Sequence, residues 1–143
     1  PELTLRFDMR EKQRDYTLAR RLVNHWRQFG RYFLGDYYPL TPYSQDRKVW
    51  MAWQFDCPET GEGLVQAFRR EESPEASARP RLVGLDPNAN YTLTNLDIAG
   101  ATEMTGRELL ETGLPLSLPD RPGAVIIIYA KKEGTDNKKE RRS

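Results

Sequence analysis

The strongest periodic pattern in the chain lies near its N-terminus, over residues 16–29. Apolar side chains recur there every three or four positions, which places them on one face of a helix. This apolar stripe consists of Leu18, Ala19, Leu22, Val23, Trp26 and Phe29. Asp15 precedes the pattern as a candidate N-cap, and Gly30 follows it as a candidate stop. The sequence therefore predicts one long helix over residues 16–29.

From about residue 44 onward the helical pattern gives way to short alternating stretches separated by turn residues. Two of them, 49–56 and 64–69, flank a turn that contains Pro and Gly, and we expect them to form a hairpin. Thr105 and Gly113 bracket a single helical turn at 106–110. Further strands are predicted at residues 78–83, 91–96, 101–104, 114–118 and 124–130. Short strands at this spacing favour an antiparallel β-sandwich.

The whole chain is therefore predicted to be mainly β with one long N-terminal helix. Leu3, Leu5 and Phe7 alternate with polar residues, so a strand is expected to precede the helix. A strand followed by one amphipathic helix is the repeating unit of a (β/α)8 barrel. We interpret residues 1–31 as the severed last strand-helix unit of a barrel and residues 32–43 as an aromatic and Pro-containing connector. A β-sandwich then covers residues 44–131, and a disordered basic tail covers residues 132–143.

Composition and charge exclude some classes of function. The chain has 143 residues, of which 38% are hydrophobic, and no apolar stretch approaches the ~18 residues of a membrane span. The last thirteen residues carry a net charge of +3, which leaves −2 for residues 1–130. A slightly acidic body argues against nucleic acid as a partner. The basic tail contains no apolar residue, so a solvated tail is expected, with a binding arm as the alternative.

Residue types that build catalytic or metal sites are scarce. A single cysteine, Cys57, excludes an internal disulfide, and a single histidine, His25, excludes a zinc site with several histidines. Phosphate-loop, dinucleotide-binding and EF-hand patterns do not occur, so neither a cofactor nor a metal is expected. We interpret His25 as a surface or packing residue and Cys57 as an ordinary thiol. The chain begins at Pro1 without a signal-like segment, which fits a piece of a longer protein or a processed protein and leaves the compartment open.

Six residues are considered for contact with a sugar. Asp8 follows the first predicted strand, where barrel enzymes build their active sites. Aromatic faces suit the apolar side of a sugar ring, and a platform is conceivable from Tyr37, Tyr38, Trp50 and Trp53, together with Tyr43. The opposing interpretations, which we favour, are a loop carboxylate for Asp8 and core or interdomain packing for the aromatics. No residue is predicted to be catalytic.

Motifs in a fixed order extend over most of the chain. They include Gly35-Asp36-Tyr37-Tyr38-Pro39, Trp50-Met51-Ala52-Trp53 and Gly84-Leu85-Asp86-Pro87-Asn88, and the full set covers residues 8–10, 15–16, 18–20, 26, 35–43, 50–55, 63–69, 84–97 and 104–114. This order resembles the C-terminal end of a family 36 glycoside hydrolase, of the α-galactosidase (melibiase) type. The resemblance implies a (β/α)8 catalytic barrel followed by an antiparallel β-sandwich.

The same resemblance implies where the chemistry lies. The two catalytic aspartates of this family belong to barrel strands that come before this point, and their Lys-Trp-Asp and glycine-rich signatures do not occur here. The resemblance thus implies a non-catalytic C-terminal domain that packs on and stabilises the catalytic barrel of an α-galactosidase-like enzyme. Its partner would be that missing barrel, with an α-galactoside oligosaccharide as a further candidate ligand. A carbohydrate-binding module and a small complete enzyme are the alternatives.

The apolar stripe of the predicted helix needs a cover when no barrel is present, because each buried side chain of this size is worth ~1.5–3 kcal/mol. The stripe can fold back onto the sheet of its own chain, or it can pair with the same stripe of a second chain in a homodimer. We favour fold-back, because the connector over residues 32–43 is short and rich in Tyr and Phe.

Overall fold

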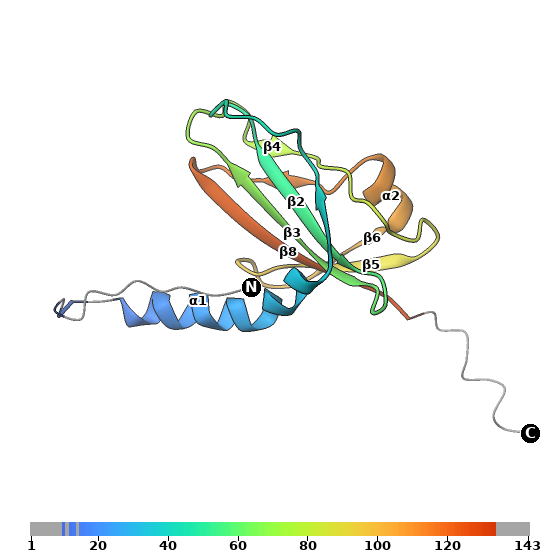
Figure 1. Ribbon diagram of the computed structural model, residues 1–143, viewed down its shortest axis with the longest axis horizontal. Helices are drawn as coiled ribbons and strands as arrows, with labels where there is room; N and C mark the ends of the chain where they lie inside the picture. The colour runs from blue at the N-terminus through green and yellow to red at the C-terminus, as the bar shows by residue number, and fades with distance from the viewer. Residues whose placement is uncertain (1–9, 11, 14, 134–143) are drawn as a thin grey trace, which may run out of the picture.

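The structure is a computed structural model that describes residues 10, 12–13 and 15–133, so the strand predicted at 3–7, Asp8 and the tail beyond residue 133 lie outside the described residues. It contains a long helix, an antiparallel six-stranded sheet and a smaller second layer (Figure 1). The elements are α1 (Tyr16–Phe29), the 3-10 helix η1 (Gly30–Leu34), β1 (Asp36–Pro39), β2 (Met51–Cys57), β3 (Glu62–Arg69), β4 (Ser77–Ala78), β5 (Asn90–Asn95), β6 (Thr102–Thr105), α2 (Gly106–Glu111), β7 (Leu116–Ser117) and β8 (Gly123–Lys131).

Helix α1 has the bounds that the periodic pattern predicts. Asp15 caps it, because its carboxylate accepts a hydrogen bond from the backbone N–H of Leu18 at 2.9 Å. The helix ends at Phe29, directly before the predicted stop at Gly30, whose φ of −56° is right-handed, and the chain tightens there into η1. Gly30 instead provides space, since a Cβ there would lie 3.2 Å from the ring of Trp26.

The large sheet has the strand order β1-β2-β3-β8-β5-β6. All of its neighbouring strands are antiparallel, and the predicted hairpin of β2 and β3 is confirmed. Strand β8 lies between β3 and β5, so the last strand of the chain joins the hairpin to the β5-β6 pair. The C-terminal strand is therefore an interior strand of the sheet, and its nine residues alternate between the two faces.

The predicted sandwich is confirmed only in part, because the second layer is not a full sheet. It consists of the two-stranded β4-β7 sheet, helix α2 and long loops (Figure 1). Residues 79–83 were expected to form a strand but make no ladder. Instead Leu82 donates to the carbonyl of Leu109 in α2, and the side-chain amide of Gln54 both donates to and accepts from the backbone of Val83 at 2.9 Å. These contacts satisfy the backbone groups that a strand partner would otherwise pair.

Two further boundaries differ from the prediction. Residues 36–39 were assigned to an irregular connector but form the edge strand β1, where Pro39 is tolerated because it stands at the end of an edge strand. Lys132 was assigned to the tail, yet its backbone N–H donates to the carbonyl of Asn90 at 2.8 Å and its ammonium group binds Glu103.

The main hydrophobic core lies between the large sheet and the second layer. We call the sheet face that borders this core the inner face. The buried core residues are Trp50, Ala52, Val65, Ala67, Leu82, Leu85, Tyr91, Leu93, Leu109, Leu114, Leu116, Val125, Ile127 and Tyr129. Because residues of β2, β3, β5, β8, α2 and the connecting loops all contribute, the chain closes this core by itself.

The turn over residues 86–89 packs against the start of α2. The carboxylate of Asp86 accepts from the backbone N–H of Asn88, and Gly106 donates to the carbonyl of Ala89 at 2.8 Å. A Cβ on Gly106 would lie 1.9 Å from the carbonyl oxygen of Asp86, so only glycine fits this close approach. Thr105 caps α2 as predicted, with Glu108 completing a capping box.

Candidate functional site

The second face of the large sheet, which we call the outer face, is also apolar. Alternation along the strands places Leu64, Ile126 and Ile128 there, opposite the inner-face positions. The end of α1 and η1 cover part of it through a chain of aromatic rings. Phe33 stacks with Trp26 at 5.6 Å between centroids and meets Phe55 of β2 edge-on at 4.7 Å. This packing fixes the C-terminal end of α1 against the sheet.

Polar contacts hold η1 in the same place. The guanidinium of Arg31 lies 2.9 Å from Glu62 at the start of β3 and 4.7 Å from the centre of the Tyr32 ring. It also donates to the Tyr32 hydroxyl at 2.7 Å, and this hydrogen bond is the largest of the effects that raise the pKa of Arg31, to which the charge of Glu62 adds less. Because the Arg31 side chain is 63% exposed, water screens the ion pair and its contribution is small.

The covered part of the outer face ends where α1 leaves the sheet. In Figure 1 the helix runs away from the lower end of β2, β3 and β8, so that α1 and these strands diverge. Leu18 is 41% exposed and Leu22 is 46% exposed, although both belong to the stripe that ends in Trp26 and Phe29. Fold-back of the stripe onto the sheet is therefore seen for the C-terminal end of α1 and not for its first two turns.

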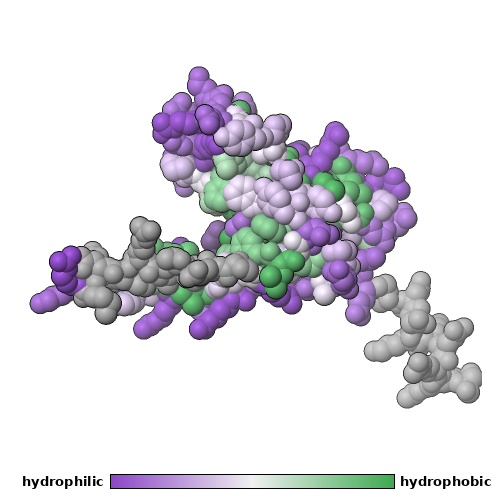
Figure 2. All heavy atoms as spheres, viewed as in Figure 1, coloured by the Kyte–Doolittle hydropathy of each residue, from purple (hydrophilic) through white to green (hydrophobic). Residues whose placement is uncertain are grey.

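Where α1 diverges from the strands, the outer face of the sheet also carries aromatic side chains that are at least partly exposed. Tyr37 of β1 is 56% exposed beside Phe55, and half-buried Trp53 packs against Phe68 at 5.1 Å. Figure 2 shows hydrophobic atoms in the hollow between the helix and the upper part of the molecule. We call this surface, made of the apolar stripe of α1 and the outer face of the sheet, the corner.

The aromatic residues considered as candidates for sugar contact lie on different faces of the sheet and do not make one continuous platform. Tyr37 and Trp53 are on the outer face, where the Trp53 indole donates to the side chain of Gln66 at 2.7 Å. Tyr38 alternates to the inner face beside Gln54. Trp50 is 9% exposed in the main core, and its indole donates to the carbonyl of Glu75. Asp8, the carboxylate candidate, lies outside the described residues.

The remaining candidates for chemistry have structural surroundings. His25 is half-buried on α1, and Cys57 is half-buried at the end of β2 within the outer-face cluster. Burial, and then the charge of Asp56, raise the pKa of the Cys57 thiol, so the reactive thiolate is disfavoured. Within the described residues, no group of three His, Cys, Asp or Glu side chains is placed to hold a metal ion. No helix of this described part is long and apolar enough to cross a membrane.

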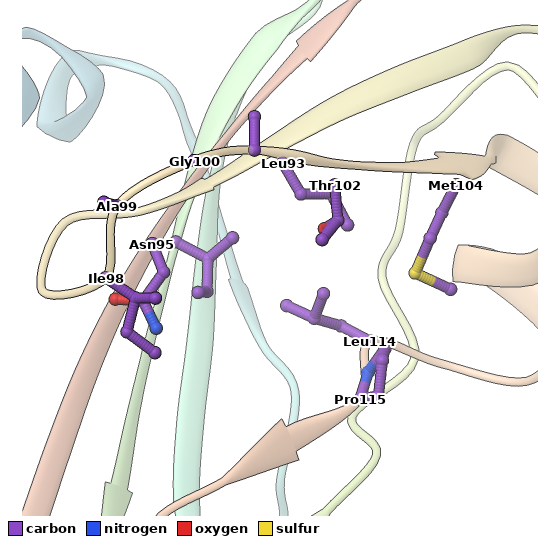
Figure 3. Close-up of a pocket in the computed structure, with 11 residues that line it drawn as sticks. Leu93, Asn95, Ile98, Ala99, Gly100, Thr102, Met104, Leu114 and Pro115 are labelled. Atoms are coloured by element: carbon purple, nitrogen blue, oxygen red, sulfur yellow. The ribbon is translucent and has the colours of Figure 1, made fainter.

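Three surface pockets are lined by residues that carry no carboxylate. One of about 290 Å³ lies under the β5–β6 loop, between Ile98 and Leu114 (Figure 3). One of about 400 Å³ borders Trp50, and one of about 160 Å³ lies between Tyr37 and Trp53 on the outer face. Hydrolysis of a glycosidic bond usually needs two facing carboxyl groups. The lining of these three pockets contains no such pair.

A buried polar cluster is the feature that the sequence analysis missed. Tyr129 of β8, which is fully buried, donates to the carboxylate of Asp56 and accepts from the amide of Gln54 at 2.8 Å. Burial raises the pKa of Asp56, against the opposing effect of the Tyr129 hydrogen bond, and burial also raises the pKa of Tyr129. Because Gln54 also binds Val83, the cluster fastens the second layer to the sheet. No sequence motif marks it, since two strands far apart in the chain, β2 and β8, supply it.

Comparison with protein families matches residues 50–134 to the family described as "Glycosyl hydrolase family 36 C-terminal domain". The match covers β2 to the end of β8, and thus the large sheet without β1. Comparison with curated protein sequences finds no significant match.

Solved structures share the fold. The galactosidase domain of the α-galactosidase-sucrose kinase AgaSK superposes with a TM-score of 0.69 and 21% identity. The α-galactosidase AgaB from Geobacillus stearothermophilus gives 0.62 and 26% identity. A variant of AgaA from the same organism, in complex with raffinose, gives 0.67 and 22%. Each match covers 85% of this chain, which spans only 17%, 16% and 17% of those chains respectively.

Proposed function

The chain belongs to the family of glycosyl hydrolase family 36 C-terminal domains, and we propose that it is the non-catalytic C-terminal domain of an α-galactosidase-type enzyme. In this proposal its corner packs on the catalytic barrel of the parent protein and stabilises it. Residues 1–31 then supply the last strand-helix unit of that barrel, and α1 is its last helix. The domain itself hydrolyses no sugar.

The observation that carries this proposal is the unequal closure of the two sheet faces. The inner face is sealed by the chain's own second layer, whereas the outer face is covered at one end only and continues into the exposed stripe at Leu18 and Leu22. A contiguous apolar surface of this kind marks an interaction site. This chain spans only 17% of the AgaSK galactosidase chain. In a parent enzyme of similar length, most of the protein could therefore form the partner surface.

Removal of the domain from the parent enzyme tests the proposal. We expect the parent without residues 50–134 to melt at a lower temperature and to lose hydrolysis of p-nitrophenyl α-galactoside, because the apolar surface that faces the corner becomes exposed to water. The isolated chain should show no hydrolysis. A truncated parent with unchanged melting temperature and activity would contradict a stabilising role.

Carbohydrate binding is a second candidate, favoured by the 160 Å³ pocket between Tyr37 and Trp53. Its two rings offer flat apolar walls at the rim of the corner, and Arg70 contributes a polar edge. Titration of raffinose, the sugar bound in the AgaA complex, into the isolated chain tests this function by the change in tryptophan fluorescence. Saturable binding that Trp53→Ala abolishes and Trp50→Phe retains would support it, and no binding at millimolar sugar would exclude it.

A further inference from the structure

A short segment of the second layer, residues 82–85, passes directly over a buried carboxylate on the inner face of the sheet. We call this segment the strap. Its two ends, Leu82 and Leu85, are buried in the main core. Between them, a Cβ on Gly84 would lie 3.2 Å from Oδ2 of Asp56, a residue that is 4% exposed. The backbone of the strap therefore helps to shut water out from this carboxylate.

Two hydrogen bonds fasten the strap to β2, and one side chain makes both of them. The amide of Gln54 donates to the carbonyl of Val83 and accepts from the N–H of Val83, each at 2.9 Å. The same amide donates to the hydroxyl of Tyr129, which in turn donates to the carboxylate of Asp56. A continuous path of hydrogen bonds thus joins the strap to the buried carboxyl group.

The titratable groups that surround Asp56 are acidic. On β1, Asp36 stands directly opposite Asp56 in the ladder, which is an unfavourable place for a like charge. The charge of Glu59, in the turn after β2, also acts on Asp56. The other titratable groups on this side are the hydroxyls of Tyr38 and Tyr129, while the strap itself carries none.

No cation compensates this negative charge. Among the described residues, no ion pair joins Asp56 to a Lys or Arg side chain. At the same end of the sheet, the two basic side chains form ion pairs of 2.9 Å with other carboxylates, Arg31 with Glu62 and Lys131 with Asp86. A buried charge without a cation is costly, and burial accordingly raises the pKa of Asp56. Water is the partner that could stabilise the ionised carboxylate, and the strap excludes it.

We propose that the strap is a pH-sensitive latch, closed over Asp56 while its carboxyl group is protonated and released from β2 more often when that group is ionised. Release breaks both hydrogen bonds between Gln54 and Val83 and lets water reach the carboxylate. The burial of Leu82 and Leu85 opposes release, so the open form stays a minority at every pH.

The direction of the pH dependence follows from proton linkage. The closed form binds the proton of Asp56 more tightly than the open form, in which water solvates the carboxylate. The equilibrium constant for opening is therefore lowest below the pKa of the open form, about 3.9. It rises as the pH rises through the higher pKa of the closed form, and it is constant above that value.

Amide hydrogen exchange of the strap in the full chain tests this proposal. The N–H of Val83 is the probe, because its hydrogen bond to Gln54 must break before it exchanges. Protection is measured by NMR between pH 4 and pH 8, after correction for the intrinsic pH dependence of exchange, with the amides of β3 as the reference for global unfolding. Asp56→Asn removes the titrating group, and Asp120→Asn, at an exposed position, is the matched control.

We expect the protection of Val83 relative to β3 to fall at least about threefold from pH 4 to pH 8 in the unchanged chain and in Asp120→Asn. In Asp56→Asn it should be independent of pH. Three results would overturn the proposal: no fall in the unchanged chain, the same fall in Asp56→Asn, or an equal fall in β3, which would mean that the whole fold opens. The unchanged chain alone gives the first and third results, so the test does not depend on the folding of a variant.

Discussion

The two faces of the large sheet differ in what completes them. On the inner face, Val65, Ala67 and Tyr129 are fully buried, and the polar side chains among them find partners within the chain. The outer face has comparable apolar residues, but its closure by α1 and η1 stops at Trp26 and Phe29. An apolar pattern along a strand therefore predicts that a sheet face is buried, but it does not predict which segment or molecule packs on that face. The inner face belongs to a self-contained fold, whereas the described residues cover the outer face only in part, and we propose that the outer face is an interface.

The largest difference is expected between two leucine truncations, one on the inner side of the sheet and one on the exposed stripe of α1. Leu109 of α2 is 0% exposed on the inner side, so Leu109→Ala should destabilise the isolated chain by about 2–5 kcal/mol. Leu22→Ala, the matched change on the exposed stripe, should lower its stability by less than about 1 kcal/mol, because 46% of that residue remains in water. Urea unfolding measures both. Equal losses would show that the stripe is covered in the isolated chain.

The buried polar cluster should be the next most sensitive feature. Tyr129→Phe removes the hydroxyl that joins Asp56 to Gln54 and leaves buried polar groups with fewer partners, so we expect a loss of about 1–3 kcal/mol. Tyr37→Phe is the control, because its ring is 56% exposed on the outer face, and this change should be close to neutral. Thermal unfolding of the two variants tests the difference, and a neutral Tyr129→Phe would contradict the role of the cluster.

Asp56 should give the inner side an unusual pH dependence. Burial raises its pKa in the folded chain, so the folded state binds its proton more readily than the unfolded state does. The contribution of this residue to stability is therefore fully present below the unfolded pKa of about 3.9 and is lost as the pH rises through the folded pKa. Asp56→Asn should remove this component and destabilise the chain little at pH 7. The measurement is the free energy of unfolding at several pH values, with a change at exposed Asp120, Asp120→Asn, as the control. The same pH profile for the two variants would contradict the role given to Asp56.

The smallest effect is expected for the ion pair that helps to hold η1 on the outer side. Arg31 and Glu62 are 2.9 Å apart, but 63% and 28% of their side chains are exposed. A double-mutant cycle with Arg31→Gln and Glu62→Gln should give a coupling energy of less than about 1 kcal/mol. A larger coupling would mean that polar contacts, rather than the aromatic rings, fix the end of α1.

The sequence predicts those elements that are specified locally. The bounds of α1 follow from its periodicity and from Asp15, and the β2–β3 hairpin follows from alternation around a turn with Pro and Gly. The path of residues 79–83 could not be predicted in the same way. It depends on the side chain of Gln54, 29 positions before Val83, which takes the place of a neighbouring strand. Strand β1 was missed because its tyrosines and Pro39 are typical of an extended connector as well as of an edge strand.

The site was predictable in its residues but not in their arrangement. The stripe of α1 and the aromatics of the following segment were recognised as packing candidates, and the structure places the end of the stripe, Phe33 and Tyr37 on the outer side of the sheet. Period-two alternation separates Tyr37 from Tyr38, and this already argues against a single platform. The Gln54–Asp56–Tyr129 cluster joins residues more than 70 positions apart, so that no local spacing could reveal it.

Amide hydrogen exchange of α1 tests the central claim most directly. The measurement compares residues 16–26 in the isolated chain and in the full-length parent enzyme, with β3 and β8 as internal references. Our account predicts that the α1 amides exchange at least about tenfold more slowly in the parent, because the partner covers the stripe, while the amides of the two strands change little. Equal protection of α1 in both proteins would contradict the claim that the parent completes the corner.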